Sequence, residues 1–122
     1  MYQLKTDLAR NRLYITLKGR ITLEESEQAA REVIAAIKTL NPGFDVITDI
    51  SELEPATKNE AEVVAGVQKV LIGHNVNRVA RVVGKELKAT VGKIQFERAS
   101  RQTQIATENF DTLEDAERYL DG

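Results

Sequence analysis

The spacing of apolar residues changes after residue 20, and this change constrains the fold more than any other feature. Residues 2–8 and 12–18 alternate apolar with polar side chains, which is typical of half-buried strands. Asn11 between them suits a hairpin turn, because asparagine tolerates a positive φ. Residues 22–40 instead place their apolar side chains along one helical stripe. The chain is therefore predicted to begin with a β-hairpin and to continue into an amphipathic helix.

Three helix starts carry the capping-box spacing, in which an acceptor side chain precedes a glutamate by three residues: Thr22 with Glu25, Thr57 with Glu60, and Asp111 with Glu114. Apolar stripes follow each of them, and Leu113, Ala116 and Leu120 form the last one. Gly73 is expected to end the second helix.

Strands are predicted between these helices, over residues 44–50, 76–83 and 104–110. The first is apolar on both faces and is expected to be central, whereas the last is expected at an edge. A further helix is predicted over residues 85–100. Strands that alternate with helices predict an α/β fold: one domain over residues 1–122, with a five-stranded, mostly parallel sheet and about four helices. The sequence leaves the strand order open.

Composition excludes several classes of function. The chain has no cysteine, so disulfides and thiol catalysis are excluded, and this suits a cytoplasmic protein. Its 17 basic and 19 acidic residues give a net charge of −2, unlike the basic excess of most nucleic-acid-binding proteins. No apolar run is long enough to span a membrane. Homo-oligomerisation remains open.

Charge is unevenly distributed near the C-terminus. Residues 78–101 carry seven basic side chains, whereas residues 102–122 are mainly acidic. We expect two solvated helix faces of opposite sign. The alternative is a basic docking patch, since Lys85 and Lys88 flank a predicted strand-to-helix turn, where an anion could bind.

Catalytic and metal-binding patterns are weak. Ser51, His74 and Asp49 could formally make a triad, but no nucleophile-elbow motif surrounds the serine. Asp49, Glu52 and Glu54 could hold magnesium, although acidic loop residues are usually just solvated. We expect no enzyme activity, no metal and no cofactor. Ligands of open α/β sheets gather outside the carboxyl ends of the strands, which here include residues 49–60.

The hairpin, the capped helix, the stretch "VITDISEL" and the helix that follows it resemble a STAS domain. The similarity is to the small stand-alone SpoIIAA-like bacterial proteins, and it extends over nearly the whole chain in element order. The resemblance implies a non-enzymatic regulator of the anti-sigma-factor-antagonist type that binds a partner protein. In that family, phosphorylation of a serine at the start of the second helix, within a pattern like Asp-Ser-Ser-Gly, prevents binding.

This sequence departs from the family at the phosphorylated position. The pattern falls on residues 57–60, so that Lys58 stands where the serine is expected. The resemblance implies a partner-binding surface formed by Asp49, Ser51, Glu52, Thr57 and Lys58, without the usual phosphoserine switch. A shifted alignment would make Thr57 or Ser51 the acceptor. Related Sec14-type domains suggest an alternative function, a carrier or sensor of a lipid or other small apolar ligand, and an enzyme of unknown class is the third.

Overall fold

The computed structural model describes residues 1–54, 57–84 and 107–122. Its strands are β1 (Tyr2–Asp7), β2 (Arg12–Gly19), β3 (Asp45–Leu53), β4 (Arg78–Val82) and β5 (Thr107–Phe110). Its helices are α1 (Leu23–Ile37), α2 (Lys58–Gly73) and α4 (Leu113–Asp121). The helix predicted over residues 85–100 lies outside the described residues.

The strands form one sheet in the order β1-β2-β3-β4-β5. Strands β1 and β2 are antiparallel, and every later neighbour is parallel. The predicted five-stranded mixed sheet is confirmed, with β3 at its centre and β5 at an edge. Because β2, β3 and β4 are parallel neighbours, their carboxyl ends meet at one end of the sheet.

The hairpin turns at Asn11, which has the expected positive φ of 53°. The prediction that Leu8 belongs to the first strand is wrong, because β1 ends at Asp7 and the Leu8 side chain is 64% exposed. Alternation alone did not show where pairing stops: Asp7 is the last residue of β1 with a partner, Arg12.

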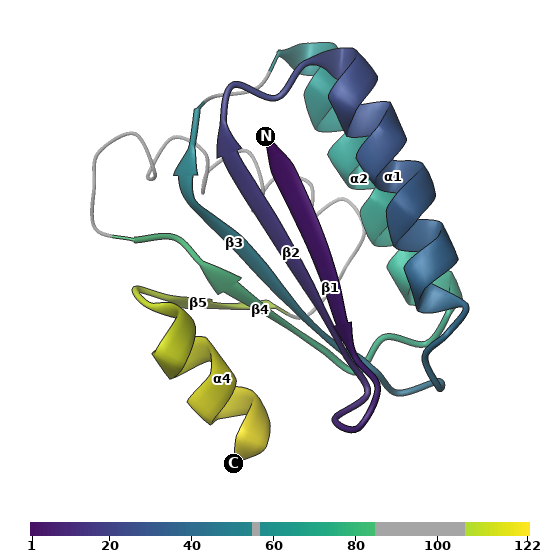
Figure 1. The fold of residues 1–122 in the computed structure, drawn as a ribbon, viewed down its shortest axis with the longest axis vertical. Helices are drawn as coiled ribbons and strands as arrows, with labels where there is room; N and C mark the ends of the chain where they lie inside the picture. Colours follow the sequence, from purple (N-terminus) through teal and green to yellow (C-terminus); the bar gives the residue numbers. More distant parts are fainter. Residues whose placement is uncertain (55–56, 85–106) are drawn as a thin grey trace.

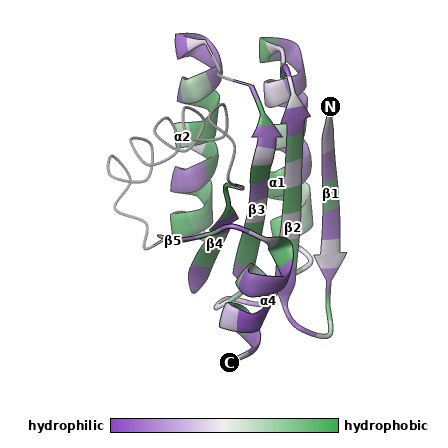
Figure 2. Cartoon of the chain, turned by 90° about the vertical axis from the view of Figure 1, so that its left-hand side faces the viewer, coloured by the Kyte–Doolittle hydropathy of each residue, from purple (hydrophilic) through white to green (hydrophobic). Residues whose placement is uncertain are grey.

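Helices cover both faces of the sheet (Figure 1). Helices α1 and α2 lie side by side on one face, where Val33 and Leu71 pack with Leu13, Phe44 and Val46. Helix α4 lies on the opposite face and packs through its buried residues onto β3 and β4; this smaller core contains Ile47, Ala80, Val82, Ala116 and Leu120. Figure 2 shows that most of α4 is hydrophilic, consistent with so narrow a buried stripe.

The predicted helix boundaries hold for the first two helices and shift for the third. Thr22 and Thr57 both form complete capping boxes. The cap of α4 is Thr112, which accepts a hydrogen bond from the backbone of Asp115, so the prediction of Asp111 is wrong by one residue. Leu113 is 37% exposed instead of buried, although it shares a helical face with Ala116 and Leu120; it is the first residue of α4.

Helix α2 ends at Gly73, as predicted, but this glycine does not adopt the left-handed conformation of a typical glycine helix end. Gly73 is its last residue and His74 is its C-cap. The left-handed residue that reverses the chain is Asn75, with φ of 62°, and not the glycine. Asparagine tolerates this conformation better than most residues because its side chain bonds locally.

Arg78 and Arg81, two of the seven basic residues counted in the expected solvated surface, lie on β4, within the predicted strand. Arg78 pairs with Asp45 at 3.2 Å and donates to the carbonyl of Leu120 at 2.9 Å, which ties the end of α4 to the sheet. Arg81 is only 1% exposed and lies on the α1–α2 face. The sequence predicted the strand, but the charge count did not show that Arg81 is buried or that Arg78 is paired with Asp45.

Candidate functional site

Asp49 and Ser51 lie near the carboxyl end of β3 and contact each other directly. Asp49 Oδ1 accepts hydrogen bonds from the backbone N–H of Ser51 at 3.0 Å and from its hydroxyl at 2.7 Å. Against β2, the register runs from Thr16 opposite Asp49 to Lys18 opposite Glu52, so β3 contains one extra residue. A bulge disrupts the ladder locally and redirects side chains, and the Asp49 carboxylate supplies an acceptor for the Ser51 N–H there.

Gly84 follows the end of β4, the strand next to β3, and lies close to Ser51. Its φ is +69°, and a Cβ at this position would lie 3.1 Å from the Cβ of Ser51. Only glycine combines this backbone conformation with so close an approach at little cost. The glycine therefore lets the chain after β4 pass against Ser51.

The start of α2 is fixed by a buried carboxylate. Glu60 is only 2% exposed. It accepts hydrogen bonds from the Thr57 backbone at 2.8 Å and from the Thr57 hydroxyl. Its other partner is Arg20, in the segment between β2 and α1, whose Nη1 lies 2.7 Å from Oε1 and 3.0 Å from Oε2. The ion pair therefore joins the first turn of α2 to the end of β2.

These contacts determine the charge state of Glu60. Burial raises its pKa, but the hydrogen bonds from Thr57 and the interaction with Arg20 outweigh burial, and the pKa lies below its ordinary value. The carboxylate is therefore ionised at neutral pH, which suits its place beside the positive end of a helix.

Lys58 and Glu52 are the exposed charges of this region. Lys58 is the first residue of α2, and its side chain lies in solvent. Glu52 pairs with Lys18 at 3.3 Å, and both side chains are largely exposed. We call Asp49, Ser51, Glu52, Thr57 and Lys58 the β3–α2 surface. Its residues lie at the end of β3 and the start of α2, at the same end of the molecule (Figure 1).

The triad that the sequence formally allowed is not assembled. Asp49 and Ser51 bond to each other, but His74 caps the far end of α2. That helix has 16 residues, which corresponds to about 24 Å at 1.5 Å per residue.

Within the described ranges, no group of three or more histidine, aspartate or glutamate side chains is placed to hold a metal ion. None of the described helices is long and apolar enough to cross a membrane. Lys85 and Lys88, the proposed anion patch, fall outside the described ranges.

Solved structures match this architecture over its full length. The anti-sigma factor antagonist SpoIIAA, in its unphosphorylated form, is 18% identical with a TM-score of 0.70, and the match covers 100% of this chain and 99% of that one. The chain has the STAS-like SpoIIAA fold. A protein with a SpoIIAA-like fold from Shewanella loihica is 21% identical with a TM-score of 0.72, covering 98% of this chain and 92% of that one.

A third match also carries the antagonist description. An anti-sigma factor antagonist from Mycobacterium paratuberculosis is 13% identical with a TM-score of 0.65, covering 100% of this chain and 94% of that one. No family model matches the sequence, and no curated protein matches it. The resemblance inferred from the element order is confirmed at the level of the SpoIIAA-like fold.

Three features of this site were not found from the sequence. The capping-box spacing located Glu60, but it did not show that the carboxylate is buried or that Arg20 is its partner. The bulge in β3 has no sequence signal of its own, and nothing in the sequence indicates that Gly84 approaches Ser51. All three depend on contacts between segments far apart in the chain.

Proposed function

We propose that this chain is a non-enzymatic regulatory module that binds a partner protein through the β3–α2 surface. The observation that carries the proposal is the full-length match to anti-sigma factor antagonists. Open α/β sheets bind ligands and partners beyond the carboxyl ends of their strands, and the β3–α2 surface lies there. The exposed Lys58 and Glu52 supply charges that a complementary partner surface can recognise.

The module acts without a phosphoserine at position 58, because lysine accepts no phosphate there. The two nearby hydroxyls are poor substitutes. Ser51 donates to Asp49 and Thr57 donates to Glu60. A phosphate on either oxygen would remove that hydrogen bond and place its negative charge beside a carboxylate, which is unfavourable.

The carrier of a lipid is the second candidate, and the size of the described cavity does not favour it. The cavity between the helices and the sheet has a volume of about 80 Å³. Pockets that enclose drug-sized ligands usually measure roughly 300–1,000 Å³. An acyl chain would therefore need a large rearrangement of α1 and α2.

Co-purification from the native host with matched charge reversals tests the proposal. Lys58→Glu should leave folding almost unchanged, since a negative charge suits a helix start. Lys69→Glu is the control, because Lys69 is exposed on the same helix but about three turns further on. We expect a protein that is recovered equally with the wild type and Lys69→Glu, and about tenfold less with Lys58→Glu, a loss of about 1.4 kcal/mol. Equal recovery with both variants would contradict a contact at Lys58.

A further inference from the structure

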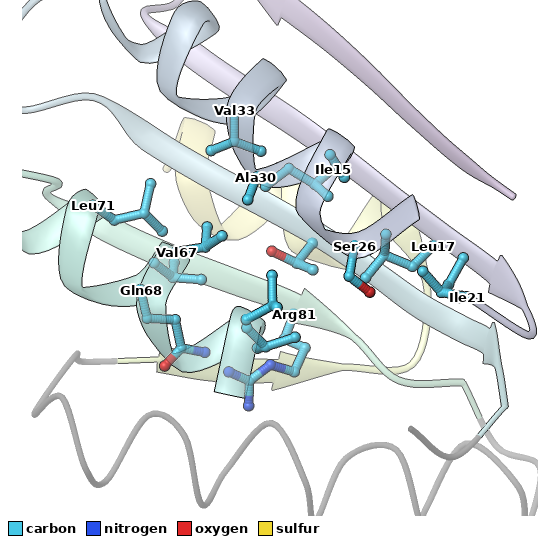
Figure 3. Close-up of a pocket in the computed structure, with 15 residues that line it drawn as sticks. Ile15, Leu17, Ile21, Ser26, Ala30, Val33, Val67, Gln68, Leu71 and Arg81 are labelled. Atoms are coloured by element: carbon cyan, nitrogen blue, oxygen red, sulfur yellow. The ribbon is translucent and has the colours of Figure 1, made fainter. Parts of the chain in front are cut away.

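A cavity of about 80 Å³ lies between the α1–α2 layer and the sheet. Figure 3 shows Val33 and Ala30 of α1, Val67 and Leu71 of α2 and Ile15 of β2 pointing into it. Ile15, Val33 and Leu71 are buried, so the floor and one end of the cavity are enclosed by the core.

The cavity exists because the two helices present short side chains where they meet above the sheet. Ala30 of α1 faces the same space as Val63 and Val67 of α2, and Ser26 lies one turn before Ala30. These four residues are half-buried, as is Leu17 of β2, whereas Ile15, Val33 and Leu71 are buried. The less buried part of the lining therefore lies mainly on the two helices.

The lining has four polar residues: Gln68 and Arg81 form a polar end, and Ser26 and Thr48 lie elsewhere among the aliphatic side chains. Gln68 and Arg81 are both buried there, and each has interactions of its own. Figure 3 shows their polar ends together, away from Ala30 and Val33. The rest of the lining is almost entirely aliphatic, and it offers water few hydrogen-bond partners. An apolar cavity of this kind is poorly hydrated and gains dispersion contacts when an apolar molecule fills it.

We propose that this cavity is a binding site for a small neutral apolar molecule, such as a short or cyclic hydrocarbon. Its volume of about 80 Å³ is roughly half of the 150 Å³ that holds benzene in an engineered apolar cavity. The cavity volume is too small to hold the acyl chain of a lipid. This site is separate from the β3–α2 surface, and it does not depend on the proposed partner binding.

Xenon and cyclopropane are the probes for the test, observed through the methyl NMR signals of the isotope-labelled protein. We expect both to shift the methyl signals of Val33, Val67 and Leu71 in a saturable way. Dodecanoate, a representative acyl chain, should neither shift these signals nor compete with xenon. No saturable shift with either small probe would overturn the site, and competition by dodecanoate would overturn its size limit.

Two alanine-to-leucine variants locate the binding. Ala30→Leu fills the cavity and should lower the xenon affinity about tenfold or more, because the new side chain takes the available space. Ala65→Leu is the matched control: Ala65 is half-buried on α2 but does not line the cavity, and xenon binding should persist. Should Ala30→Leu fail to fold, Val67→Ile narrows the same space by one methyl group and should weaken binding. Undiminished xenon binding in the folded cavity variant would contradict the assignment.

Discussion

Glu60→Gln should destabilise the fold more than its conservative chemistry suggests. The wild-type carboxylate is 2% exposed and accepts bonds from Thr57 and Arg20. A bond to a charged group contributes about 1.5–3 kcal/mol and a neutral one about 0.5–1.5 kcal/mol. Neutralising the acceptor therefore costs about 1 kcal/mol for each of these two partners. Arg20 is half exposed, so water compensates part of its loss, and we expect a total of about 1–2 kcal/mol.

The loss should depend on pH with a defined sign. The folded-state pKa of Glu60 is lowered, so the stability that its ionised form contributes is present above the unfolded-state pKa, about 4.3. That contribution is lost as the pH falls through the folded-state pKa. The difference between wild type and Glu60→Gln should therefore be full at pH 7 and shrink in acid.

Urea unfolding followed by circular dichroism measures both effects through the midpoint and slope. Glu25→Gln is the control, because Glu25 forms the same capping box at the start of α1 but is considerably more exposed. It should cost less than Glu60→Gln. Equal midpoints for wild type and Glu60→Gln at pH 7, or a difference that does not change with pH, would refute the role assigned to the buried ion pair.

Four further substitutions test the geometry. Thr57→Ala should cost about 1 kcal/mol in urea unfolding through the lost cap, and no loss would contradict the capping role. Gly84→Ala should destabilise by about 1–3 kcal/mol because of its positive φ and the approach to Ser51. In contrast, Gly66→Ala, in open space within α2, should stabilise by about 0.5–1 kcal/mol. Melting temperatures of Gly84→Ala and Gly66→Ala that shift in the same direction would contradict these opposite effects. Leu120→Ala should cost about 2–3 kcal/mol, and an unchanged melting temperature would mean that α4 contributes little.

The sequence predicted the elements well where local chemistry controls them. The capping boxes at Thr22 and Thr57 depend on residues three apart, and the hairpin turn depends on the tolerance of Asn11 for a positive φ. The centrality of β3 followed from apolar residues on both of its faces. Local chemistry was less reliable at element ends: at the C-terminus of α2, Asn75 took the left-handed position expected for a neighbouring glycine.

The candidate site was predicted in position but not in detail. The sheet rule and the family resemblance both indicated the end of β3 and the start of α2. Neither indicated the Arg20–Glu60 pair, whose members are 40 residues apart, or the approach of Gly84 to Ser51. Arg81 lies in the predicted strand, but it was expected to be solvated because charge usually indicates exposure, whereas its side chain is buried. Such contacts are tertiary, and no spacing rule within one segment encodes them.

Photo-crosslinking in the native host tests the central proposal most directly. Benzoylphenylalanine is placed at position 58, and in a parallel strain at position 69, an exposed site of the same helix. We expect a specific adduct with one partner protein from position 58 and none from position 69. The adduct from position 58 should still form when the cell extract is treated with phosphatase before irradiation. No position-specific adduct, or one formed only from position 69, would contradict a partner-binding surface at the start of α2.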